Sequence, residues 1–186
     1  MRQVSVFLSL LCFVLSFLLG VYSVLDYNDN IRKLDNLNLD IQYSVANLTF
    51  ASILKTNLVV IAQLLVGSFL FGLTTFLSVG VNGYHLGSYT ATAILNRSFD
   101  KFLVLTIPHA IFEIPAIITA GAAGFKIPCE IIRYLLGKKE RILTKEDIKE
   151  YLTLALISII LIVIAAWVEA NVTLRIAKTM LKTKGI

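Results

Sequence analysis

The chain is poor in the residues and motifs that build most catalytic and redox sites. It has two cysteines, three prolines, two histidines and one tryptophan among 186 residues, and only 16% of its residues are charged. Cys12 and Cys129 are far apart, so they have no metal-type spacing. The HExxH, GxSxG and glycine-rich nucleotide-binding motifs do not occur either. These absences argue against a zinc peptidase, a serine hydrolase and a chain that uses ATP by itself.

Apolar residues dominate what is present. The chain is 57% hydrophobic, and its mean hydropathy is +0.80. A soluble domain of this length could not bury so much apolar surface, so the composition predicts one integral membrane domain over residues 1–186. The net charge of +5 does not indicate a nucleic-acid partner. The basic residues lie mainly at the ends of apolar segments, where they contact lipid headgroups.

A polar loop separates the first apolar segment from the rest. Residues 4–25 carry no charge and are long enough to cross the membrane, which we interpret as an uncleaved span and not a signal peptide. The polar loop over residues 26–56 contains Leu34, Leu37 and Ile41 at helical spacing. That spacing fits either a short amphipathic helix at the membrane surface or a solvated linker helix.

Residues 56–96 form an uncharged stretch that is too long for one span. As a single helix it would be roughly 60 Å long, about twice the hydrocarbon thickness of a bilayer. Residues 80–83 contain an Asn-Gly pair, which favours a turn because both residues tolerate positive φ. We therefore predict a second span over about 57–79 and a broken third element over 83–106, whose part near 83–97 is short or re-entrant.

The last two spans are predicted over about residues 108–136 and 148–174. Pro108 suits the first turn of a helix, where its missing N–H costs nothing, whereas Pro115 lies inside the helix and predicts a kink. The Thr144–Asp147 segment has the spacing of a capping box that opens the final helix. The predicted fold class is all-α: a polytopic membrane helical bundle of about five transmembrane helices.

The stretch over residues 106–124 holds the most unusual polar residues. His109 and Glu113 are four residues apart, so they share one face of a helix. A carboxylate is costly in hydrocarbon and is expected to face protein or water. The polar intramembrane cluster that we predict around this pair consists of Asn82, His85, His109, Glu113, Glu169 and Asn171.

Small residues recur at every fourth position in two segments, and this pattern is typical of close helix packing. The two strips consist of Gly83, Gly87 and Ala91, and of Ala116, Ala120 and Gly124. Such strips either pack on each other within one chain, which is the default expectation, or join copies in a homo-oligomer.

Several sequence blocks together form a recognisable combination. The central block is PHAIFEIPA at residues 108–116, followed by AGAAG at 120–124. Upstream lie the Asn82–Gly83 pair and Gly87, and the block AAWVEANVT closes the set at residues 165–173. In this combination the chain resembles the stage II sporulation protein M family of integral membrane proteins.

The resemblance implies a membrane protein that acts through partners. In spore-forming bacteria, members of this family belong to the engulfment machinery. There they anchor a peptidoglycan-degrading complex with sporulation proteins D and P. The family also occurs in organisms that neither sporulate nor have peptidoglycan. The resemblance therefore implies the membrane fold but does not by itself imply the sporulation role.

The polar residues are compatible with three different functions. The first is a scaffold or assembly partner, in which His109 and Glu113 only stabilise the bundle. The second is a small-solute or ion/proton-coupled transporter, with Glu113 as coupling site and Glu169 as a second station. The third is a metal-dependent enzyme with His85, His109 and the two glutamates as ligands.

Of these functions we predict the scaffold, without enzymatic activity, cofactor or metal. The expected location is the cell membrane, which the chain crosses several times. The expected partners are the lipid bilayer, other membrane or envelope proteins and a second copy of the chain, with no nucleic acid.

Overall fold

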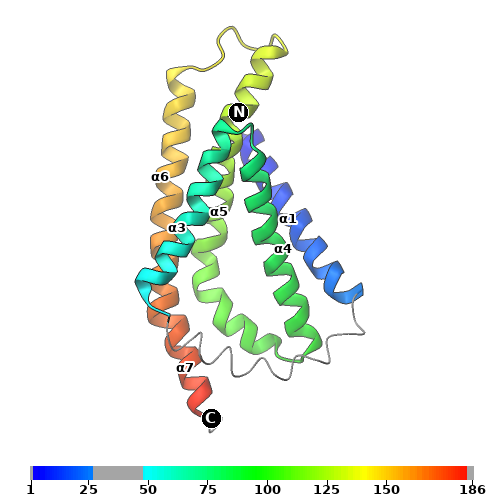
Figure 1. The fold of residues 1–186 in the computed structure, drawn as a ribbon, viewed down its shortest axis with the longest axis vertical. Helices are drawn as coiled ribbons and strands as arrows, with labels where there is room; N and C mark the ends of the chain where they lie inside the picture. Colours follow the sequence, from blue (N-terminus) through cyan, green and yellow to red (C-terminus); the bar gives the residue numbers. More distant parts are fainter. Residues whose placement is uncertain (1, 27–47, 184–186) are drawn as a thin grey trace.

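The computed structural model describes residues 2–26 and 48–183, and all regular elements in these two ranges are helices. In chain order they are α1 (Arg2–Asp26), α3 (Phe50–Val66), the 3₁₀ turn η2 (Gly67–Phe69), α4 (Leu73–Leu95), α5 (Phe99–Leu135), α6 (Lys145–Val168), the π-helical η3 (Glu169–Thr173) and α7 (Leu174–Thr183) (Figure 1). The predicted all-α class is confirmed. The amphipathic helix considered around Leu37 lies outside the described residues.

The helices carry apolar side chains on their outer faces. On α1, Ser5 and Ser9 are buried, whereas Phe7 and Leu15 are exposed. Such a surface is unfavourable in water and favourable against lipid tails. By length and composition, four segments of the described ranges can cross a membrane: Gln3–Asp26, Phe50–Phe69, Phe99–Leu135 and Lys145–Met180. The fold is therefore an α-helical membrane bundle.

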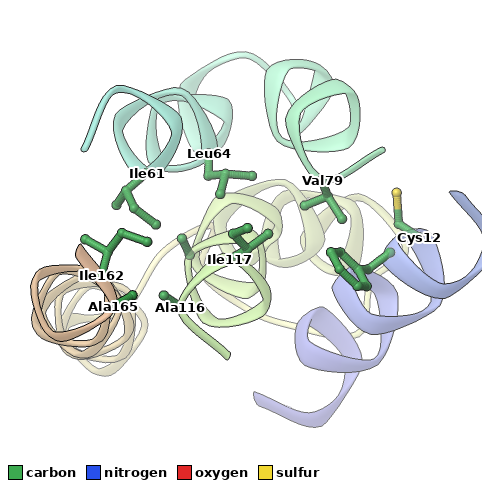
Figure 2. Packing of buried hydrophobic residues seen from close by; sticks show 10 residues of the cluster. Cys12, Ile61, Leu64, Val79, Ala116, Ile117, Ile162 and Ala165 are labelled. Atoms are coloured by element: carbon green, nitrogen blue, oxygen red, sulfur yellow. The ribbon is translucent and has the colours of Figure 1, made fainter. Parts of the chain in front are cut away.

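Helix α5 is the central element of the bundle. Figure 2 shows it between α6, α3, α4 and α1, which all contribute side chains to one apolar core. Small residues let these neighbours approach α5 closely. The fully or almost fully buried core residues include Ile61, Leu64, Val79, Ala116, Ile117, Ala120, Ile162 and Ala165.

The chain reverses direction between α3 and α4 at a different place from the predicted one. The turn is formed by η2 and Gly72, whose φ of +82° is accessible to glycine at little cost. Its N–H donates to the Gly67 carbonyl at 2.7 Å. The predicted turn at residues 80–83 is wrong, because Asn82 donates to the Ser78 carbonyl one turn earlier in a continuous α4.

The predicted limits of the second and third elements are corrected accordingly. The second span begins earlier, at Phe50, where Thr49 and Ser52 form a capping box. Residues 83–97 are the second half of α4 and the corner that follows, not a separate short element. The predicted break in this region is confirmed and lies at residues 96–98, between α4 and α5.

Helix α5 is continuous and bent. It starts at Phe99 rather than near residue 108, so Pro108, Pro115 and Pro128 all lie inside it. Its first part lies across the lower end of the bundle before the helix turns upward (Figure 1). A proline inside a helix removes one backbone hydrogen bond and crowds the preceding turn, which accounts for such a bend.

The two strips of small residues contact different helices and do not pack on each other. A Cβ atom added at Gly87 would lie 2.0 Å from the carbonyl oxygen of Phe17, so α4 touches the backbone of α1. A Cβ atom added at Gly124 would lie 2.2 Å from the carbonyl oxygen of Leu64 on α3. The default expectation that the two strips pack on each other is therefore wrong. Both strips nevertheless make close helix contacts within the chain.

We predict that Gly87→Ala destabilises the protein and that Gly80→Ala does not. The methyl group at position 87 must displace the backbone of α1, at a cost of about 1–3 kcal/mol. Gly80 is the matched control on the same helix, since its added Cβ would meet only the Ser16 hydroxyl at 3.4 Å. Thermal unfolding midpoints in detergent would measure both effects. Equal midpoints for the two variants would contradict the close contact of α1 with α4.

Candidate functional site

A cavity of about 250 Å³ lies between α1, α4 and the first half of α5. Six of its twelve lining residues have polar side chains. The lining residues are Phe13, Asn82, His85, Leu86, Tyr89, Phe102, Thr106, His109, Ala110, Glu113, Ile114 and Ile117. Four of the six residues predicted as a polar cluster therefore meet here, brought together from α4 and from the bend of α5.

His109 is held between two polar partners. Its Nδ1 lies 3.2 Å from the hydroxyl oxygen of Thr173, within hydrogen-bond distance. Its Nε2 lies 3.7 Å from a carboxylate oxygen of Glu113, which is an ion pair only when the imidazole is protonated. The hydroxyl of Thr173 thus fixes the ring so that its other nitrogen faces the carboxylate.

The second carboxylate comes from the π-helical η3. Glu169 begins this element and is close enough to Glu113 for the two charges to interact. Single π-helical turns are frequent at functional sites, because they redirect side chains within an otherwise regular helix. Within residues 2–26 and 48–183, neither carboxylate forms an ion pair with a lysine or arginine.

The observed site differs from the predicted polar cluster at two residues, one that is absent from it and one that was not predicted. Asn171 is not brought into the cavity, because its side-chain amide donates to the Trp167 carbonyl at 2.9 Å along the same helix. Thr173 was not predicted, although it contacts His109 directly. No linear spacing indicates this contact, since the two residues are 64 positions apart and meet only in the folded bundle.

The described residues do not form a metal centre. Among them, no three histidine, cysteine, aspartate or glutamate side chains lie close enough to hold one ion together. His85 stacks on Tyr89 with ring centroids 6.0 Å apart.

A second polar cluster, which the sequence did not suggest, braces the α5–α6 hairpin. Lys126 is about 2% exposed, and its ammonium lies 2.5 Å from Glu150 and 3.3 Å from Glu130. Lys126 and Glu130 are four residues apart on α5. Their i, i+4 spacing was a signal for an ion pair, but the partner on α6 could not be deduced.

Lys139 closes this network from the loop between the helices. Its ammonium donates to Glu130 at 2.9 Å and also to Asp147. Burial disfavours its charged form, but the two hydrogen-bonded carboxylates outweigh burial and raise the pKa of Lys139 above its ordinary value. The predicted capping box is confirmed, since Thr144 and Asp147 exchange hydrogen bonds at the start of α6.

Both polar clusters lie in the part of the chain that matches a known protein family. The model of Stage II sporulation protein M matches residues 9–174. The chain belongs to this family. The resemblance recognised from the sequence blocks is thereby confirmed, and the cavity, η3 and the hairpin all fall within the family region.

Two relatives of this family member come from Methanocaldococcus jannaschii. The uncharacterised protein MJ0793 is 41% identical over 180 residues, which cover 96% of this chain and 99% of the relative. The uncharacterised protein MJ0706 is 31% identical over 153 residues, which cover 80% of this chain and 66% of that protein. No solved structure matches the chain.

For this family member we predict that Lys126→Met lowers the free energy of unfolding by about 3 kcal/mol. The substitution leaves half-buried Glu150 without its closest cation and removes one of the three cations around buried Glu130. Lys138→Met is the control, because Lys138 is exposed on the same hairpin. Denaturant titrations in detergent would compare the two variants with the wild type. A loss no larger for Lys126→Met than for Lys138→Met would contradict a stabilising role of the network.

Proposed function

We propose that this protein is a non-enzymatic scaffold of the cell membrane. In this proposal it crosses the bilayer five times and presents its α5–α6 hairpin to other membrane or envelope proteins. The observation that carries the proposal is an ion-paired hairpin with exposed apolar side chains that reaches past the α3–α4 turn.

The charge-free length of the helices supports this placement. On α6, residues 151–168 carry no charge and span about 27 Å, close to the hydrocarbon thickness of a bilayer. The Lys126–Glu150 pair marks one end of this belt and Glu169 the other. The α3–α4 turn lies at the first level, because a Cβ atom added at Gly72 would be 3.0 Å from the Phe125 ring. In this proposal α4, which runs between the same levels, is the fifth crossing beside the four apolar segments.

The α5–α6 hairpin extends beyond that level. Figure 1 shows it reaching past the α3–α4 turn, at the end of the bundle where the N-terminus also lies. Residues 127–135 add roughly 13 Å of helix there. Its exposed apolar residues include Leu135 at 74% and Leu136 at 63% exposure, with Ile132, Ile142 and Leu143 nearby in sequence. Grouped apolar side chains outside the membrane mark interaction sites.

The arrangement at His109 supports a non-enzymatic role. Thr173, His109 and Glu113 are the kinds of group found in a hydrolytic triad. However, Thr173 is only 7% exposed and does not line the cavity. A substrate in the cavity would not reach its hydroxyl oxygen, so these contacts are better explained as stabilising the junction of α5 with η3.

We predict that a photo-crosslinker at Leu136 captures protein, whereas one at Ile160 captures lipid. Both side chains are exposed, but Ile160 lies in the uncharged part of α6. A benzophenone side chain would be placed at each position in the full chain and activated in native membranes. A discrete protein adduct specific to position 136, either a partner or a second copy, is expected. Lipid adducts alone at both positions would contradict the scaffold.

Transport is a second candidate, favoured by the cavity and its two carboxylates. The way from the cavity to the hairpin side is closed by packed core residues, among them Val79 and Ala120. Movement of α5 would therefore be needed to open a path. Transport predicts a proton or small-ion flux in liposomes that Glu113→Gln abolishes while the fold is retained. Equal flux in protein-free liposomes and in liposomes with the wild type would rule this candidate out.

A further inference from the structure

We propose that the cavity beside the bend of α5 binds an organic ammonium ion with a short apolar tail, and that Glu113 is its counter-ion. The site requires neither the scaffold role nor the transport role to be correct. It rests on three features of the cavity: the balance of charge, the chemistry of the walls and the size.

Among the described residues at the cavity, the carboxyl side chains are not matched by lysine or arginine. Glu113 lines the cavity, and Glu169 interacts with Glu113 from η3. No lysine or arginine is among the lining residues, and within the described ranges neither carboxylate is paired with one. Glu113 is partly buried, and such a carboxylate is stabilised by a cation at hydrogen-bond distance. The site therefore favours a positively charged occupant.

The described residues favour an organic cation over a metal ion. They offer no group of three metal-binding side chains at this place. The walls instead combine apolar side chains, such as Leu86 and Ile114, with the aromatic rings of Phe102 and Tyr89. Aromatic faces attract ammonium groups, and the aliphatic walls suit a hydrocarbon tail.

The size of the cavity limits the occupant. A volume of about 250 Å³ corresponds to roughly eight groups of the size of a water molecule. An alkylammonium ion of six carbons has this size, and so does the headgroup end of a lipid with an ethanolamine group. Tyr89 lines the cavity and is 61% exposed, so part of the cavity wall lies at the surface of the bundle.

The internal alternative is that protonated His109 neutralises Glu113. The two groups are 3.7 Å apart, which is longer than a hydrogen bond. A cation that lies closer to the carboxylate than the imidazole does would interact with it more strongly. The binding experiment distinguishes the two arrangements.

The test is calorimetric titration of the full chain in a non-ionic detergent with two probes, hexylammonium and 1-hexanol. The probes share one hydrocarbon tail and differ in charge. Saturable binding of hexylammonium and no comparable binding of hexanol are expected. Glu113→Gln should weaken hexylammonium binding at least about tenfold, the factor supplied by one charge-assisted hydrogen bond. Glu146→Gln, an exposed carboxylate on the hairpin, should leave it unchanged.

A second variant keeps the proposal testable if Glu113→Gln does not fold. Ala110→Leu keeps the carboxylate and fills part of the cavity, so it should also abolish binding. Equal affinity for hexylammonium and hexanol, unchanged affinity in either cavity variant, or no hexylammonium binding at all would overturn the proposal. The last result is the one that neutralisation of Glu113 by protonated His109 predicts.

A separate experiment distinguishes a lipid headgroup from a soluble amine as the natural ligand. Native mass spectrometry would compare retention of a lipid with an ethanolamine headgroup and one with a glycerol headgroup on the same protein. Preferential retention of the ethanolamine lipid that is lost in Ala110→Leu would support a lipid ligand. Binding of hexylammonium without any headgroup preference would support a soluble amine.

Discussion

The close approach of helix backbones to one central helix is the constraint on which the rest of this structure depends. In lipid, no hydrophobic force drives helices together, so they must gain from packing and from hydrogen bonds between helices. Helix α5 meets both needs with its run of alanine and glycine from Ala120 to Gly124. The Ser9 hydroxyl on α1 donates to the Ile118 carbonyl, and Ser68 donates to the Ala123 carbonyl. These hydroxyls reach the backbone of α5 because alanine and glycine side chains are too small to block access to it.

The same central helix produces both polar clusters. Its prolines bend the first half away from α4 and leave room for a cavity, whereas its second half is straight enough to pair with α6 along the hairpin. Among the described residues, the carboxylates at the bend have no lysine or arginine partner, and those in the hairpin have several. One helix thus holds unbalanced charge at one end and balanced charge at the other. This contrast is why we assign ligand binding to the bend and presentation to the hairpin.

The sequence was sufficient for the fold class and for part of the site. Composition predicted a helical membrane bundle, and the sequence blocks around His109 and Glu113 predicted the family. The turn was misplaced because Asn82-Gly83 has strong local turn chemistry, yet the helix continues through it and its glycines pack on α1. The contact of Thr173 with His109 and that of Lys126 with Glu150 depend on how helices meet. No pattern within one helix contains that information.

The braced hairpin also has a consequence for experimental structure determination. A chain of 20.6 kDa whose bulk is embedded in a bilayer offers electron cryomicroscopy few features for particle alignment. A soluble domain inserted after Gly137, whose added side chain would meet nothing within 4 Å, would be joined to two helices already locked by buried ion pairs. Such a fusion would inherit a fixed orientation relative to the bundle, making the hairpin a ready attachment point for a fiducial marker.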